Sequence, residues 1–323
     1  VEAEGEYVAL LDRDDLLSPQ ALNEVAGSLQ DNPKWRWVYS DEDFINEKGG
    51  RVSPHFKSDW NPYLLDAHNY ITHLSVYMKS LLAEIGGCQI GYEGAQDYDL
   101  SLRASSVLKK DEIGHIAKVL YHWRMHSGST SSDSASKPYT VEAGKKALQD
   151  HFIRKGKVVE INEGNLDNYF DVKYFPESWP KVSIVIPTRD HFDVLKNCID
   201  SLFEKTSYPD YELIVVDNQS SSLGSINYLK ELSFLDCVKV LKYDKAFNYS
   251  DINNFAVEKS TGDVIVLLNN DTEVLCEDWL QRMVGLAMQD DVGCVGAKLL
   301  YPDHTIQHAG IIMGLGGYAA HSH

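Results

Sequence analysis

Two aspartates follow a strongly apolar segment near the start of the sequence. Asp12 and Asp14 come directly after the run 7–11, which is predicted to be a buried strand. Open α/β sheets place their ligands at the carboxyl ends of their strands. If the strand geometry continued, both carboxylates would point the same way, and their hard oxygens would suit Mg²⁺ or Mn²⁺. The sequence therefore predicts a divalent metal site, although such a pair can also be a plain helix-capping turn.

A second acidic pair stands at the start of a predicted helix. Leu100 and Arg103 have helical spacing, which places Asp97 and Asp99 in the first turn. A carboxylate exposed there could take a proton from a hydroxyl group, and Asp97 is the candidate for this general base. The alternative is that the two aspartates cap the helix, a role that suits Asp99 better.

A stretch rich in cationic and hydroxyl side chains, 121–131, follows the apolar segment 116–120, which is predicted to be a strand. Such side chains suit contact with a diphosphate. His126 within it is a candidate third metal ligand, although a lone histidine is more often structural.

The second half of the sequence alternates predicted strands and helices, in the order typical of a parallel α/β sheet. The strands are expected at 182–186, 213–216, 238–241 and 264–268. Polar side chains follow three of them. Asp217 could bond to a uracil or thymine imide and Asp271 could hold a metal ion, although Asp, Asn and Ser are also common in ordinary turns. Pro187, Thr188, Asp190, Asp217 and Asn269 stand at or just after the ends of these strands and are candidates for binding a nucleotide.

The two halves share a repeated pattern. The segment 5–14 aligns with 262–271 without a gap, and both are apolar runs that end in acidic or amide side chains before a helix pattern. We therefore expect an α/β fold with two tandem copies of one domain, both incomplete. Residues 1–137 would be the C-terminal portion of the first domain, 138–179 a helix and linker, and 180–323 the N-terminal portion of the second.

Composition narrows the class of protein. Of 323 residues, 43% are hydrophobic, so the chain can bury a sizeable core. A formal net charge of -18 argues against a nucleic acid as the main partner. The five scattered cysteines fit a reducing, cytoplasmic setting. No run approaches the roughly 18 apolar residues of a membrane span, so no transmembrane segment is expected.

Three ordered motifs, at 11–15, 93–100 and 124–129, resemble those of glycosyltransferase family 2. The resemblance covers nearly the whole sequence, and it is strongest to the tandem-domain enzymes of bacterial O-antigen and surface-polysaccharide synthesis, including rhamnosyltransferase-like members. It implies the GT-A fold, a Rossmann-like fold of nucleotide-diphospho-sugar transferases. Gln96 and Asn269 depart from this pattern, because each replaces the commoner acidic residue.

The resemblance also implies roles. Asp12 and Asp14 would hold Mn²⁺ or Mg²⁺, Asp97 matches the base of an inverting transferase, and His126 lies where some members place a metal or diphosphate ligand. The donor would be a UDP- or dTDP-sugar, and the acceptor a growing glycan or a lipid-linked saccharide. Such an enzyme works in the cytoplasm, with peripheral association at the cytoplasmic face of the inner membrane as a further expectation.

Two alternatives stay open. The chain could be a catalytically incomplete fragment that binds only metal or nucleotide, because the base of the second copy would lie beyond His323. An aspartate pair after an apolar strand also fits the nucleophile and assisting acid of a HAD-type phosphohydrolase. That second hypothesis leaves the repeat unexplained, since Asn269 cannot be a nucleophile.

Overall fold

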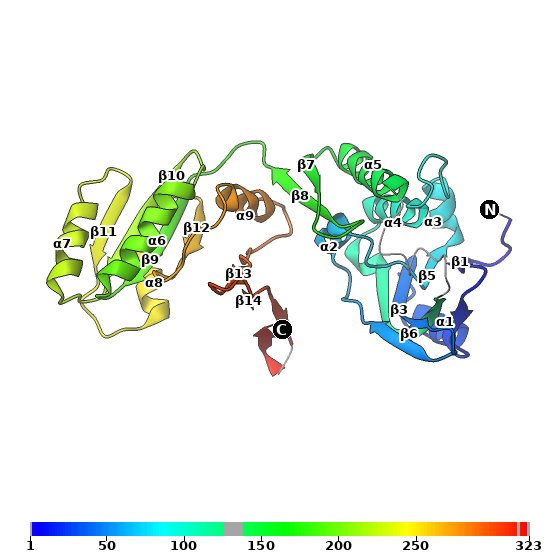
Figure 1. The fold of residues 1–323 in the computed structure, drawn as a ribbon. Coiled ribbons are helices and arrows are strands. Elements are labelled where there is room, and N and C mark those ends of the chain that lie inside the picture. Colours follow the sequence, from blue (N-terminus) through cyan, green and yellow to red (C-terminus); the bar gives the residue numbers. More distant parts are fainter. Residues whose placement is uncertain (1, 126–137, 315–316, 322–323) are drawn as a thin grey trace. The chain divides into compact units, whose positions relative to one another are not determined.

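The computed structural model describes residues 2–125, 138–314 and 317–321, and it divides into two compact units. Unit 1 is Val1–Lys173 and unit 2 is Tyr174–His323. Each unit combines strands with packed helices, so the predicted α/β class is confirmed (Figure 1). The segment expected to be a helix and linker, 138–179, begins with α5 (Pro138–Lys155), and this helix belongs to unit 1.

A mixed sheet forms the centre of unit 1. Its described strands have the order β1-β5-β3-β6-β2, and β4 pairs with β3. β3 is parallel to β6 and antiparallel to β5. The strands are β1 (Tyr7–Leu10), β2 (Leu16–Leu17), β3 (Trp37–Ile45), β4 (Arg51–His55), β5 (Ser75–Met78) and β6 (Ile113–Arg124). The helices are α1 (Ala21–Asp31), α2 (Pro62–Ala67), α3 (Lys79–Glu84), α4 (Gln96–Val107), the short 3₁₀ helix Lys110–Glu112, and α5.

Helices α4 and α5 pack side by side in unit 1 (Figure 1). Leu100 and Leu102 of α4 and Leu148 and Phe152 of α5 are almost completely buried. Burial of this apolar contact fixes the position of α4, and therefore of the acidic residues in its first turn. The strands β7 (Val158–Glu163) and β8 (Phe170–Phe175) follow α5 and pair with each other.

Unit 2 contains the parallel sheet that the sequence predicts. Its described strand order is β11-β10-β9-β12, and every pair is parallel. The chain runs outward from β9 to β11 and then returns to pair β12 with the free edge of β9. Open sheets bind ligands beside such a reversal. The strands are β9 (Val182–Thr188), β10 (Tyr211–Asp217), β11 (Val238–Lys242) and β12 (Val264–Leu267). The helices are α6 (Phe192–Lys205), α7 (Leu223–Leu232), α8 (Tyr249–Val257) and α9 (Trp279–Ala287).

Side chains of β9 alternate between two cores. Val182, Ile184 and Ile186 pack on one face with residues of α6, α7 and α9, whereas Val185 packs on the other face with residues of α8. Because helices cover both faces, this strand is apolar at most positions, unlike a strand with one solvated face.

Two short ladders follow α9. They pair β13 (Leu299–Leu300) with β14 (Ile306–His308), and β15 (Ile311–Met313) with β16 (Ala319–His321). Within the described ranges, no helix has both the length and the apolar character needed to cross a bilayer.

Two helical glycines give a paired test of packing. A Cβ on Gly285 in α9 would lie 2.1 Å from the carbonyl oxygen of Tyr174, whereas one on Gly27 in α1 would meet nothing within 4 Å. We expect Gly285→Ala to lower the free energy of unfolding by about 1–3 kcal/mol, because the backbone at Tyr174 or in α9 must move to make room for the methyl group. Gly27→Ala should raise it by about 0.5–1 kcal/mol through helix propensity. Urea denaturation measures both, and a stabilising Gly285→Ala would contradict the close approach.

Candidate active site

Asp97 lies in the first turn of α4, as predicted. Asn69 Nδ2 donates a hydrogen bond to Asp97 Oδ2 at 2.8 Å. The side chain is partly exposed. Burial among surrounding protein atoms nevertheless raises the pKa of Asp97; the electrostatic effect of the nearby His73 ring opposes this rise, and the charge of Asp12 adds to it. A carboxylate of raised pKa is a stronger proton acceptor, so the surroundings of Asp97 suit a general base.

Asp99 has a different environment, although it is two residues away. Positions two apart on a helix point about 200° from each other. Asp99 therefore faces the core, where it is fully buried and accepts hydrogen bonds from Arg103 Nε at 2.9 Å and Nη2 at 2.6 Å. The predicted capping role of Asp99 is wrong, because Ala95 is the N-cap and the described bonds of the Asp99 carboxylate go to Arg103.

The turn that carries Asp12 and Asp14 does not continue the strand before it. β1 ends at Leu10, and the Asp12 carbonyl accepts a hydrogen bond from Asp15 N at 3.3 Å. The prediction that strand geometry aligns the two carboxylates is therefore wrong. Both are exposed. Asp15 anchors the turn instead, by accepting a hydrogen bond from Tyr121 Oη at 2.5 Å.

The chemistry of this turn fits a hard divalent cation, because Asp12 and Asp14 bring carboxylate oxygens. Across the part of the chain that the structure describes, no three His, Cys, Asp or Glu side chains form a group that could hold a metal ion. A bound ion would take its other ligands from water and substrate oxygens, as Mg²⁺ commonly does. His126, the predicted third ligand, lies outside the described residues.

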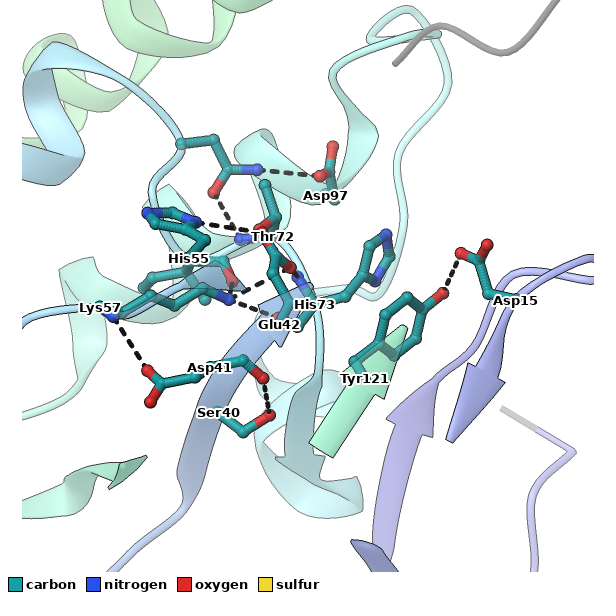
Figure 2. A network of polar contacts seen from close by, with 12 residues as sticks. Asp15, Ser40, Asp41, Glu42, His55, Lys57, Thr72, His73, Asp97 and Tyr121 are labelled. Carbon is teal, nitrogen blue, oxygen red and sulfur yellow. Dashed lines mark hydrogen bonds and ion pairs between the residues drawn. The ribbon is translucent and has the colours of Figure 1, made fainter. Parts of the chain in front are cut away.

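His73, which no sequence motif indicates, lies beside the predicted residues. Its ring stacks on Tyr121, with centroids 4.6 Å apart and planes 13° apart. Its Nε2 is 3.8 Å from Asp12 Oδ2. Figure 2 shows the imidazole between Asp97 and Tyr121. The structure thus brings Asp12, His73 and Asp97 together from three separate parts of the chain.

A buried ion pair holds the loop 69–73 that carries His73 (Figure 2). Glu42 accepts hydrogen bonds from Thr72 Oγ1 at 2.7 and 2.9 Å and from His73 N at 3.1 Å. Lys57 Nζ lies 3.3 Å from Glu42 Oε2 and donates to the carbonyl oxygens of Ile71, at 2.5 Å, and His73. Burial lowers the pKa of Lys57 to about 8, although Glu42 opposes this. The loop is therefore tied to β3 through both its side chains and its backbone.

β3 carries a signal for this site that is visible in the sequence. Its acidic residues 41–43 stand inside an apolar strand, and all three are buried. Each carboxylate contacts a histidine, at 2.9, 3.2 and 2.5 Å in chain order. The pairs are Asp41 with His115, Glu42 with His55, and Asp43 with His122. Three consecutive acids within a buried strand need such partners, since unpaired buried charge is costly.

Unit 2 has a cavity of about 270 Å³ at the carboxyl ends of its parallel strands. The last residues of β9 and residues just after β9, β10 and β12 line it, together with residues of α8 and the loop before α8. Three of the predicted residues, Pro187, Thr188 and Asn269, are among the lining side chains. The others are Arg189, His191, Asn218, Phe247, Tyr249, Ile252 and Asn270.

Asp190, Asp217 and Asp271 are not among the described lining residues of this cavity. Asp190 Oδ1 accepts hydrogen bonds from the backbone N–H groups of Ser221 at 2.8 Å and Ser222 at 2.7 Å, and these bonds lower its pKa. Asp217 Oδ1 accepts from the backbone of the same loop. Asp271 is exposed. The first two aspartates therefore shape the loop beside the cavity.

Asn218 is a lining residue that the sequence analysis did not single out. It is 2% exposed, and its Nδ2 donates to the carbonyl oxygens of Tyr243 at 3.1 Å and Lys245 at 2.9 Å. Its Oδ1 is buried and has no hydrogen-bond partner among the described residues. The cavity is therefore bordered by an acceptor that a ligand donor could satisfy.

Unit 2 is an α/β domain whose cavity lies where open parallel sheets bind nucleotides. Residues 183–309 match the model of the family described as Glycosyl transferase family 2. This part of the chain is therefore similar to glycosyl transferase family 2, and the three motifs at 11–15, 93–100 and 124–129 lie outside the matched residues.

Longer bacterial proteins are similar along nearly the whole chain. The uncharacterized protein y4gI of Sinorhizobium fredii is 46% identical over 99% of the chain and 36% of its own length. The O-antigen biosynthesis protein RfbC of Myxococcus xanthus is 39% identical over 98% of the chain and 24% of its own length. Chondroitin synthase of Pasteurella multocida is 24% identical over 83% of the chain and 27% of its own length. The chain thus spans little more than a third of these relatives at most.

Proposed function

We propose that the protein is an inverting, metal-assisted glycosyltransferase of GT-A fold that moves a sugar from a nucleotide-diphosphate donor to a growing surface glycan. The observation that carries this proposal is the surroundings of Asp97, which is held by Asn69, has a raised pKa and interacts electrostatically with Asp12. In a single displacement a general base can take the proton of the acceptor hydroxyl, and a metal held by carboxylates can stabilise the leaving diphosphate. The similarity of unit 2 to glycosyl transferase family 2 supports the reaction class.

In the proposed reaction Asp97 takes the proton of an acceptor hydroxyl while the hydroxyl oxygen bonds to the anomeric carbon of the donor sugar. The bond from that carbon to the diphosphate breaks, and the nucleoside diphosphate leaves from the opposite face, so the anomeric centre is inverted. Asp12 and Asp14, with His126, would hold Mn²⁺ or Mg²⁺, which when bound supplies positive charge beside the leaving diphosphate. Asn69 keeps the carboxylate of Asp97 in place.

We infer that the cavity of unit 2 is a nucleotide pocket for a UDP- or dTDP-sugar. Pro187, Thr188 and Asn269 would contact the ligand directly, since they line the cavity. Asp271 would add a metal ligand at its edge, and Asp190 and Asp217 would hold the surrounding loop. In both units a strand, β1 or β12, leads into a polar turn and then to a helix, α1 or α9, with the two-residue strand β2 between the turn and α1 in unit 1. This common order supports the proposal that the units are tandem copies of one domain.

The acceptor is proposed to be a glycan or a lipid-linked saccharide, because RfbC, which is similar to this chain, has a name that refers to O-antigen biosynthesis. Donors of this kind are cytoplasmic metabolites, so the proposed reaction belongs in the cytoplasm, at the cytoplasmic face of the inner membrane.

Donor binding is tested by the thermal midpoint of the chain. UDP or dTDP with Mn²⁺ should raise the midpoint relative to Mn²⁺ alone, because a ligand that binds the folded state stabilises it by about 2.7 kcal/mol at 100 times its Kd. Asp271→Ala should remove the rise. Asp236→Ala, an exposed aspartate just before β11 and so at the opposite end of the strands, is the matched control. A rise without nucleoside diphosphate release would support a binding fragment, and no rise would contradict the pocket.

A further inference from the structure

His73 has one ring nitrogen in the protein interior and one that faces the site. The residue is 8% exposed, and its Nδ1 is buried without a hydrogen-bond partner among the described residues. Its Nε2 is the nitrogen near Asp12, at 3.8 Å from Oδ2. That separation is too long for a hydrogen bond, so Asp12 does not satisfy Nε2 directly.

This arrangement selects one form of the ring. A neutral imidazole carries a single N–H. A proton on Nδ1 would be a buried donor without an acceptor, which costs about 1–3 kcal/mol. A proton on Nε2 instead points toward the polar side of the site. Metal-bound histidines almost always donate their other N–H to a partner. His73 has no such partner at Nδ1 among the described residues, so its surroundings favour a hydrogen-bond donor over a metal ligand.

The backbone around His73 is fixed in an unusual conformation. Thr72, a β-branched residue, has a φ of 40°. Such a conformation persists only where surrounding contacts enforce it, and it is common at functional sites. The contacts here are those of Glu42 and Lys57 with the loop 69–73. The same loop supplies Asn69, which binds Asp97. One loop therefore sets the positions of both the proposed base and the imidazole.

The neighbours of His73 indicate which ligand atom its N–H would meet. Asp97 is the proposed base, so the group that meets it must carry a proton to give, which a diphosphate held at the metal of Asp12 and Asp14 does not. A hydroxyl group is neutral, and it can accept one hydrogen bond while donating another. It can accept from His73 Nε2–H and donate to Asp97, which is the arrangement that proton transfer to Asp97 requires.

We propose that His73 is a substrate-binding residue that donates a hydrogen bond from Nε2 to the acceptor sugar hydroxyl that Asp97 deprotonates. The inference rests on the proposed function, and it adds the residue that orients the acceptor oxygen. As the hydroxyl loses its proton to Asp97, the His73 N–H stays on the ring and stabilises the negative charge that develops on the oxygen.

Two variants of the whole chain distinguish the hydrogen-bond donor of His73 from the packing of its ring. His73→Phe keeps the stack on Tyr121 but has no donor, whereas the side-chain amide of His73→Gln can place an N–H near the position of Nε2. Transfer is measured as nucleoside diphosphate release from UDP-glucose or a dTDP-hexose with Mn²⁺, with methyl glucoside, galactoside and rhamnoside as acceptors. We expect His73→Phe to lower the acceptor-dependent rate about 100-fold. His73→Gln should keep most of that rate, and both variants should keep the midpoint rise with UDP or dTDP.

A spectroscopic measurement on the wild-type chain tests the same inference without any variant. Long-range ¹H–¹⁵N correlation spectra distinguish the two neutral tautomers of a histidine ring, and the missing signals of His73→Gln or His73→Phe assign His73. The Nε2–H tautomer is expected. The Nδ1–H tautomer, or a His73→Phe rate within about twofold of wild type, would overturn the inference and leave the proposed function standing. If the wild-type chain releases no nucleoside diphosphate with any of these combinations of donor and acceptor sugar, both the inference about His73 and the proposed function are overturned.

Discussion

Replacing Asp97 by asparagine is expected to slow sugar transfer about 10³-fold, because an amide cannot take up the proton of the acceptor hydroxyl. The substitution keeps the size of the side chain and an oxygen that can accept the hydrogen bond from Asn69. Its effect should therefore fall on kcat, and the free energy of unfolding should change little. The measurement is nucleoside diphosphate release at saturating donor and acceptor, beside urea denaturation of the same variant.

A matched control is Asp31→Asn, which makes the same chemical change at the exposed end of α1. It should transfer sugar at the wild-type rate. If Asp97→Asn keeps more than about a tenth of the wild-type activity, Asp97 is not the base, since general base catalysis contributes at least about 10²-fold.

The raised pKa of Asp97 also predicts where kcat/KM falls on the acidic side of its pH profile. The base acts in its ionised form, so kcat/KM should fall as the pH drops through the pKa of Asp97. Because burial raises that pKa, the fall should occur at a higher pH than for an ordinary exposed aspartate. A profile that stays flat down to the range of ordinary carboxylates would contradict this assignment.

The largest expected loss of stability comes from Arg103→Leu. This variant leaves the Asp99 carboxylate, which is fully buried, without its cation. Breaking a buried ion pair from one side costs about 3–5 kcal/mol, because the remaining charge is uncompensated. Arg103 Nη1 also donates to the Ile85 carbonyl oxygen at 2.6 Å, so that acceptor loses a partner as well. The free energy of unfolding of unit 1, measured in urea, should fall accordingly.

The double variant Asp99→Leu with Arg103→Leu separates the charge from the packing. It removes both ions, so it should be clearly more stable than Arg103→Leu alone, although the Ile85 carbonyl oxygen still lacks its donor. Equal losses in the single and double variants would show that packing, and not the unpaired carboxylate, dominates the effect. Asp97→Asn makes a useful contrast in the same helix, because it is expected to alter rate without altering stability.

The local pattern of apolar and polar residues was sufficient to predict much of the fold. The four parallel strands of unit 2 lie where the apolar segments predict them, because strands that are buried on both faces are mostly apolar. Asp97 lies in the first turn of α4 for a similar reason, since Leu100 and Arg103 share its helical period. Strand-end positions likewise placed Pro187, Thr188 and Asn269 at the cavity.

Predictions that extended one element's geometry into the next were less successful. The turn after β1 does not continue the strand, because the hydrogen bond between Asp15 N and the Asp12 carbonyl closes it. Asp99 does not cap α4. A helix period shows that Asp97 and Asp99 face different ways, but the packing partner decides which of them is buried, and that partner is Arg103 with the core around it.

The sequence by itself thus determined the α/β class, the parallel sheet of unit 2 and the helix that carries Asp97, because each depends on residues close together in the chain. The tertiary structure alone decided which side chains surround Asp97. Asn69 and His73 come from a loop with no distinctive local pattern, and Glu42, some 30 residues before His73, binds that loop. Such contacts depend on how β3 pairs with its neighbours, and no spacing within one segment encodes that pairing.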